Sequence, residues 1–134
     1  MIKKLLKPDL VWKKLLAEEQ YHILREKGTE IAFTGKYNKF KEKGLYYCAA
    51  CDNLLFSSSA KYDSGTGWPS FFQPISEEAV IIQQYIGQEM NGAEVLCARC
   101  EGHLGHLFLE GTKTGKRYCI NSAILVFKPE KNKK

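Results

Sequence analysis

Residues 93–127 read AEVLCARCEGHLGHLFLEGTKTGKRYCINSAILVF, and they carry the clearest strand signals in the chain. They contain four short runs rich in apolar, β-branched and aromatic side chains: residues 93–96, 106–109, 117–120 and 123–127. The loop between the second and third runs contains the segment Gly111 to Gly115, which is a loose hairpin signal. Short strands joined by such turns predict antiparallel sheets rather than parallel strands with helical crossovers.

The same pattern extends upstream. Further short runs occupy residues 45–47, 54–56 and 79–86. Asn91-Gly92 is a strong two-residue hairpin signal between the last of these runs and residue 93. We therefore predict a single mainly β domain, residues 1–134, in which two antiparallel sheets pack together. The lysine-rich end from about residue 129 is expected to be a frayed tail.

The N-terminal residues predict helix instead. Apolar side chains recur at helical spacing from Trp12 to Leu24, and Asp9 stands where an N-cap is expected. We expect the helix to break near Ala17-Glu18 into two shorter helices. Lys27-Gly28 is a typical end, because a cation and then a glycine are favoured there.

Four of the five cysteines form two Cys-x-x-Cys pairs: Cys48, Cys51, Cys97 and Cys100. Each pair can present two thiolates from one tight turn, and two such turns complete a tetrahedral four-sulfur site. The 45 residues between the pairs exceed the usual zinc-finger interval. We therefore predict a structural Zn²⁺, one per chain, that clips two distant hairpins together. A closed four-sulfur site stabilises a fold and leaves no open position for catalysis.

Other readings of the paired cysteines exist. Iron fits the same four sulfurs, and the sequence does not separate it from zinc. A redox Cys-x-x-Cys usually occurs once, near a strand–helix–strand pattern that this chain lacks. Disulfides are disfavoured because residues 1–8 are basic but contain only two consecutive leucines, too few for a secretory signal.

The same features favour a cytoplasmic location. No stretch approaches the roughly 18 consecutive apolar residues that a membrane span needs, so no membrane association is expected. The net charge of +5 is divided unevenly: residues 1–43 carry +5, residues 44–111 carry −6 and residues 112–134 carry +6. Because the acidic middle holds the paired cysteines and repels phosphates, we expect no nucleic-acid partner.

The fifth cysteine, Cys119, lies in the sequence RYCINS at residues 117–122. A free cysteine is more often buried and inert than reactive. Whether Cys119 is reactive therefore has to be judged from the side chains around it. Arg117 and Asn121 alternate with Cys119 along a predicted strand and share its face. The positive charge is expected to lower the pKa of the thiol. His103 and His106 lie in the connection expected before the preceding strand, and histidine is the natural proton donor near neutral pH.

Trp68 lies in the sequence DSGTGWPSFF at residues 63–72. Two glycines and a proline around a tryptophan suggest a fixed loop that presents an aromatic face. A plain turn with a core tryptophan fits the spacing equally well.

Together these motifs resemble the B-type methionine sulfoxide reductases. The resemblance rests on the two Cys-x-x-Cys pairs and on three further motifs: GTGWPSF at residues 65–71, between the pairs, and HLGHLF at 103–108 and RYCINS at 117–122, after the second pair. It extends from about Trp12 to Phe127. It implies a β-rich fold, zinc on the four paired cysteines, and selectivity for the R epimer of methionine sulfoxide.

The resemblance also implies catalytic roles. Cys119 is then the nucleophile that attacks the sulfoxide sulfur and becomes a sulfenic acid. His103, His106 and Asn121 hold the sulfoxide oxygen, directly or through water, and supply protons. An acid beside the nucleophile is required because a sulfoxide is a poor electrophile until its oxygen is protonated.

The implied substrates are oxidised proteins and peptides. Trp68 would pack against the methyl group of the substrate, and Phe108 and Arg117 would help to shape the site. We expect the chain to act as a monomer.

The sequence departs from the family pattern at two places. Many members carry a resolving cysteine where this chain has Thr66. With four cysteines assigned to metal, we expect a one-cysteine enzyme whose sulfenic acid is reduced directly by thioredoxin, glutaredoxin or a small thiol. Where members often show Pro-Asp-Gly, this chain has Leu109-Glu110-Gly111, and Glu110 is the candidate for the acidic position.

Two other functions compete with this one. A non-enzymatic zinc-binding module explains the paired cysteines and basic ends, but it leaves Trp68, the two histidines and Cys119 without a purpose. A zinc hydrolase needs an open metal with a bound water, so one cysteine pair would have to remain off the metal.

Overall fold

The computed structural model describes residues 2–84 and 92–130. The helices are α1 (Asp9–Leu15) and α2 (Glu18–Glu26). The strands are β1 (Gly44–Cys48), β2 (Leu54–Ser57), β3 (Lys61–Tyr62), β4 (Ser70–Phe71), β5 (Val80–Gln83), β6 (Ala93–Cys97), β7 (His103–Leu109), β8 (Lys116–Ile120) and β9 (Leu125–Pro129). Short 3₁₀ turns occupy Ser58–Ala60, Glu77–Ala79 and Ser122–Ile124.

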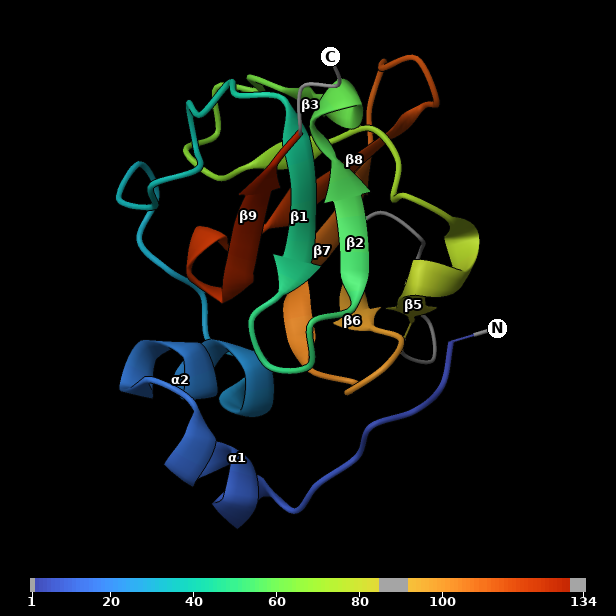
Figure 1. The fold of residues 1–134 in the computed structure, drawn as a ribbon. Coiled ribbons are helices and arrows are strands. Elements are labelled where there is room, and N and C mark those ends of the chain that lie inside the picture. Colours follow the sequence, from blue (N-terminus) through green and yellow to red (C-terminus); the bar gives the residue numbers. More distant parts are fainter. Residues whose placement is uncertain (1, 85–91, 131–134) are drawn as a thin grey trace.

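The strands form two sheets, with the orders β2-β1-β9 and β3-β4-β8-β7-β6-β5. The pairings within both sheets are antiparallel across the described ranges. Figure 1 shows the smaller sheet in front of the larger one, with the two helices grouped at one end. The prediction of a mainly β fold with two antiparallel sheets and a helical N-terminus is therefore confirmed.

An aromatic core joins the two sheets. Along β1, buried positions alternate with half-buried ones, as expected for a strand with one face turned inward. Tyr46 from the smaller sheet meets Phe71 from the larger one, with ring centroids 5.3 Å apart. Phe56 of β2 stacks on the same Phe71 ring at 4.3 Å. Burial of these rings helps to hold one sheet against the other.

The predicted break in the helical segment is confirmed, since α1 ends at Leu15 and α2 begins at Glu18. The expected N-cap is wrong: Pro8 takes that position, and Asp9 lies in the first turn, where its carboxylate pairs with Arg25 at 3.1 Å. α2 ends at Glu26, and its C-cap Lys27 adopts a left-handed conformation with φ of 60°. Neither helix, nor any other helix within residues 2–84 and 92–130, is long and apolar enough to cross a membrane.

Strand limits differ from the prediction in several places, and β5 begins at Val80 and ends at Gln83 instead of spanning residues 79–86. β3 and β4, of two residues each, were not predicted because so short a run shows no alternation. β9 starts at Leu125 because a 3₁₀ turn precedes it. β7 starts at His103, three residues before the predicted start at His106, so His103 lies in the strand and not in the connection before it. The predicted strand end at Ile86, Asn91 of the predicted hairpin and residues 131–134 of the tail lie outside the described residues.

Candidate active site

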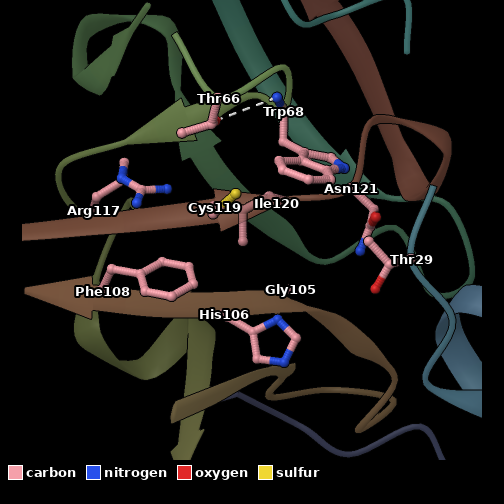
Figure 2. A pocket seen from close by; sticks show the side chains of 10 residues that line it. All are labelled: Thr29, Thr66, Trp68, Gly105, His106, Phe108, Arg117, Cys119, Ile120 and Asn121. Atoms are coloured by element: carbon pink, nitrogen blue, oxygen red, sulfur yellow. Dashed lines mark hydrogen bonds between the residues drawn. The ribbon is translucent and has the colours of Figure 1, made fainter. Parts of the chain in front are cut away.

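A cavity of about 190 Å³ opens over strands β7 and β8. Its lining comes from these strands and from the loops around residues 29 and 66–68: Thr29, Thr66, Trp68, Gly105, His106, Phe108, Arg117, Cys119, Ile120 and Asn121. Figure 2 shows Trp68 and His106 on opposite sides of Cys119. The fold therefore brings six of the seven predicted catalytic and substrate-binding residues to one cavity, and only His103 lies outside its lining.

The register between β7 and β8 places the reactive side chains together. Cys119 lies directly opposite His106, and Arg117 lies opposite Phe108. Because alternate residues of a strand share one face, these four side chains project from the same side of the sheet. Gly105 makes the close strand approach possible, since a Cβ atom there would lie 1.9 Å from the carbonyl oxygen of Cys119.

Cys119 is half-buried at the floor of the cavity. Burial raises the pKa of its thiol above the ordinary value, while the charge of Arg117 and a hydrogen bond with Thr66 oppose that rise. Arg117 thus acts in the predicted direction, but the net pKa of the thiol is still raised, because desolvation of the thiolate outweighs the attraction to the cation. Thr66, the position at which a resolving cysteine would stand, lines the same cavity as the nucleophile.

Arg117 is held in place from both sides. Its guanidinium carbon lies 4.6 Å from the centroid of the Phe108 ring, in a cation–π arrangement. Its Nε donates to Glu110 at 2.9 Å, and the Tyr62 hydroxyl donates to the same carboxylate at 3.1 Å. The bond from Arg117 lowers the pKa of Glu110. An ionised Glu110 outside the cavity lining is an anchor for Arg117 and a poor proton donor.

Trp68 and Asn121 are fixed through the backbone of one residue, Glu30. The Trp68 indole Nε1 donates to the Glu30 carbonyl at 3.0 Å, and the Glu30 amide donates to Asn121 Oδ1 at 2.9 Å. Asn121 Nδ2 donates one hydrogen to the carbonyl of Leu104 at 3.0 Å, so its second hydrogen is available to the cavity. Trp68 is half-buried, which favours the reading of a loop that presents an aromatic face.

The two predicted histidines have different environments. His106 lines the cavity; burial and the neighbouring His103 lower its pKa, and Glu94 acts in the opposite direction. His103 is buried, and its Nδ1 lies 2.7 Å from the carboxylate of Glu94. The rings of His103 and His106 meet edge to face, with centroids 5.2 Å apart. The structure thus assigns His106 to the cavity and His103 to the layer behind it.

Sequence analysis missed several residues of this region. Thr29, Gly105 and Ile120 line the cavity, and Glu30 and Glu94 support its walls. Of these, Glu94 had a usable signal, because a lone acidic residue in an apolar strand run needs a partner when it is buried.

The paired cysteines converge on one buried cluster. The Sγ atoms of Cys48, Cys51, Cys97 and Cys100 lie within 4.8 Å of one another. Cys48 and Cys100 are 3.8 Å apart, and Cys51 and Cys97 are 3.4 Å apart. A tetrahedral ion with metal–sulfur bonds of about 2.3 Å separates its sulfurs by about 3.8 Å, so the cluster fits such an ion.

The two cysteine turns have the same backbone design. In the first, the Asp52 amide donates to the Cys48 carbonyl at 2.8 Å; in the second, the Glu101 amide donates to the Cys97 carbonyl at 2.8 Å. Both closing residues are left-handed, with φ of 63° for Asp52 and 62° for Glu101. Each turn therefore points two sulfurs inward from a fixed loop, as a metal site requires.

Charge explains why the cluster needs a cation. The hydrogen bonds among the thiols lower the pKa of Cys97 and raise that of Cys48, because a buried group of four cannot ionise together without a positive charge. With all four sulfurs on one ion, no coordination position stays open for water. The zinc hydrolase alternative, in which one pair stays off the metal, finds no support in this arrangement.

Comparison with known proteins identifies close relatives. Residues 16–129 match the family described as SelR domain. A peptide methionine sulfoxide reductase MsrB of Leptospira interrogans is 55% identical over 125 residues, which cover 92% of this chain and 95% of that protein. An MsrB of Methanosarcina barkeri is 54% identical over 129 residues, covering 96% of this chain and 91% of that protein. The chloroplastic peptide methionine sulfoxide reductase B1 of Oryza sativa is 53% identical over 121 residues, covering 90% of this chain and 56% of that protein.

Proposed function

The chain belongs to the B-type methionine sulfoxide reductases, and from this premise we propose that it reduces the R epimer of methionine sulfoxide in peptides and proteins through Cys119. Family membership makes the chain an oxidoreductase that acts on methionine sulfoxide. The observation that carries the residue assignment is the pairing of Cys119 with His106 across β8 and β7, at the floor of a cavity beside Trp68.

The proposed reaction transfers one oxygen atom. The Cys119 thiolate attacks the sulfoxide sulfur, the sulfur–oxygen bond of the substrate breaks, and the oxygen ends on the cysteine as a sulfenic acid. Methionine leaves with a two-electron reduction of its sulfur, and Cys119 is oxidised by the same two electrons. The thiol proton is regained on the transferred oxygen, so thiol plus sulfoxide gives sulfenic acid plus thioether with no atom left over.

His106 is the proposed proton carrier. It lines the cavity opposite the nucleophile, whereas Glu110 is ionised by its pairing with Arg117. Attack requires a thiolate together with a proton donor for the sulfoxide oxygen. Moving the Cys119 proton to the His106 ring supplies both at once, and the ring then protonates the oxygen as the sulfur–oxygen bond breaks.

The remaining lining residues orient the substrate. The indole face of Trp68 offers an apolar contact for the methyl group of the substrate. Phe108, whose ring packs against the guanidinium of Arg117, forms another part of the cavity wall. The second hydrogen of Asn121 Nδ2 can be donated to the sulfoxide oxygen. Such contacts discriminate the two epimers because they fix the methyl group, the oxygen and the chain of the substrate at three separate points.

Recycling is proposed to follow a one-cysteine route. The chain has five cysteines, and the other four form the buried cluster. Thr66 occupies the place beside Cys119 where a resolving thiol would stand. Two equivalents of an external thiol then return the sulfenic acid to the thiol, releasing water and a disulfide. We propose thioredoxin, glutaredoxin or a small thiol as this reductant.

We propose that the ion of the cysteine cluster is Zn²⁺, held by Cys48, Cys51, Cys97 and Cys100. Zinc forms closed four-sulfur sites that contribute folding energy and take no part in redox chemistry. The site binds the β1–β2 turn to the β6–β7 turn, and so supports the start of the strand that carries His106.

The decisive experiment compares turnover of a methionine-R-sulfoxide peptide by the zinc-loaded wild type and by Cys119→Ser, with dithiothreitol as reductant and the S epimer as control. We expect R-selective reduction by the wild type and none by the variant. Equal turnover of both epimers would contradict the stereochemical assignment. Activity retained in Cys119→Ser would contradict the nucleophile. The cytoplasmic location and the monomeric state stay predictions.

A further inference from the structure

A buried carboxylate lies behind the proposed active site. Glu94 of β6 is 4% exposed and stands directly opposite His106 of β7 in the sheet register. Since His106 is in turn opposite Cys119, one row across three strands contains Glu94, His106 and Cys119. The Glu94 carboxylate contacts His103 Nδ1 at 2.7 Å, and its other oxygen lies 3.3 Å from Lys27 Nζ.

We propose that Glu94 and His103 act as a positioning pair for His106, holding its ring at the cavity and stabilising the protonated ring during oxygen transfer. This inference rests on the proposed function. Neither residue of the pair lines the cavity, so both would act through His106 and not on the substrate.

Geometry supports the positioning role. Glu94 is an acceptor when ionised, so Nδ1 of His103 carries the hydrogen of the 2.7 Å bond. This fixes the rotation of a ring that is 3% exposed. The fixed ring meets His106 edge to face, at 5.2 Å between centroids and an interplanar angle of 68°. Displacing His103 would therefore remove one wall of the space in which the His106 ring sits.

Charge supports the stabilising role. The titratable and charged groups around His106 are Glu94 from β6, His103 from β7 itself, and Cys119 and Arg117 from β8, with Lys27 after α2 facing Glu94. Glu94 is the one carboxylate in this group. When His106 takes a proton, the buried anion on its own row offsets the cost of placing that charge in a partly buried site.

The chemistry resembles the general arrangement of a nucleophile, a proton carrier and a group that orients the carrier. Here the orienting unit has two members, because His103 stands between the carboxylate and the ring of His106. Glu94→Gln is therefore a clean probe: it keeps the size of the side chain and an oxygen acceptor for His103, and removes only the charge.

The first measurement is the titration of His106 by NMR, with the three histidines assigned through His22→Gln and His103→Gln. We expect Glu94→Gln to lower the pKa of His106. The exposed Glu26→Gln, which makes the same chemical change on α2, is the matched control and is expected to leave the pKa of His106 unchanged. This readout needs no substrate, so it tests the pair even where the proposed function fails.

The second measurement is the pH dependence of methionine-R-sulfoxide reduction. The acid limb should move to lower pH in Glu94→Gln, and the plateau should fall about tenfold for each unit by which the pKa of His106 falls. A purely structural defect would lower the plateau without moving the limb. In His103→Gln, adding Glu94→Gln should cost less than it does in the wild type, because the positioning effect of the carboxylate passes through His103 and only its direct charge effect on His106 remains.

The proposal is overturned by an unchanged pKa of His106 together with an unmoved acid limb in a folded Glu94→Gln. It is also overturned by full additivity of the two substitutions. If the wild type reduces no methionine-R-sulfoxide but the pKa of His106 falls in Glu94→Gln, the pair stands and the proposed function is wrong.

Discussion

Cys119 and His106 are cross-strand neighbours, directly opposite each other on β8 and β7. Side chains in such a pair have Cβ atoms about 5 Å apart, so a thiol and an imidazole are held at one cavity by the sheet itself. The environment moves their pKa values apart: burial raises the pKa of Cys119 and lowers that of His106. The resting pair is therefore a neutral thiol and a neutral imidazole that share one removable proton.

This pairing predicts a bell-shaped pH profile of kcat/KM. The reactive state holds one proton between the two groups, so activity falls when His106 gains a second proton and when Cys119 loses the last one. Because the pKa of His106 is lowered, the acid limb should lie below pH 6.5; because that of Cys119 is raised, the alkaline limb should lie above pH 9.0. Stopped assays across pH 4–11 would measure both limbs.

His106→Asn should abolish the acid limb, whereas the same change at the exposed His22 should leave it in place. An acid limb that survives in a folded, active His106→Asn would assign the proton carrier to another residue.

Arg117 is expected to set the alkaline limb. Its charge favours the Cys119 thiolate, so Arg117→Met should raise the pKa of that thiol further. Glu110→Gln removes the countercharge of Arg117 and keeps an acceptor for its Nε hydrogen, so this variant should shift the same pKa downward. The rate of Cys119 alkylation by iodoacetamide as a function of pH gives the pKa directly. Shifts of the same sign in both variants would contradict the role of the Arg117 charge.

Removal of the metal should unfold the domain. The cluster links the turn after β1 to the turn after β6, and four buried thiols without a cation lose this link. We expect one zinc per chain by elemental analysis, loss of metal in Cys97→Ser, and a strongly lowered Tm in that variant. Cys119→Ser, which removes the thiol outside the cluster, should keep both its zinc and its Tm. A Tm unaffected by complete chelation would contradict a structural metal.

Gly105→Ala should destabilise the larger sheet. A methyl group there would lie 1.9 Å from the backbone oxygen of Cys119, and only separation of β7 from β8 relieves that overlap. Overpacking of this kind costs about 1–3 kcal/mol of unfolding free energy. Gly111→Ala is the control, since a methyl group at Gly111 meets no atom within 4 Å and should change stability by less than about 0.5 kcal/mol. Urea denaturation of both variants measures the difference.

The parts of the structure that were predictable from sequence rest on local signals. The Cys-x-x-Cys spacing of Cys97 and Cys100 predicts a metal turn because two sulfurs three residues apart reach one ion from a single loop. Alternation along β8 likewise predicts that Arg117 and Cys119 share a face. Neither prediction requires knowing which segments of the chain pack together in the fold.

The unpredicted parts depend on register and on competing energies. A shift in the pairing of β6 with β7, between Val95 and Leu96, brings Glu94 within reach of His103, and no spacing rule shows such an irregularity. The pKa of Cys119 depends on two opposing effects, the burial of its thiol and the charge of Arg117. The sequence shows that the charge is present, but it does not show how deeply the thiol is buried. Two-residue strands such as β3 exist only because a neighbouring strand pairs with them.

The shared cavity position of Thr66 and Cys119 predicts that a resolving thiol can be installed. Both side chains line the same cavity, so in Thr66→Cys the introduced thiol would attack the Cys119 sulfenic acid and release water. After one turnover without reductant, intact-mass spectrometry should show wild type with one added oxygen and Thr66→Cys with two hydrogens lost. Ser64→Cys is the matched control: Ser64 bonds to Thr66 at 2.8 Å and is one step farther from the nucleophile, so it should keep the added oxygen. A disulfide in the wild type would contradict the one-cysteine route, and a persistent sulfenic acid in Thr66→Cys would show that the two side chains do not meet during the catalytic cycle.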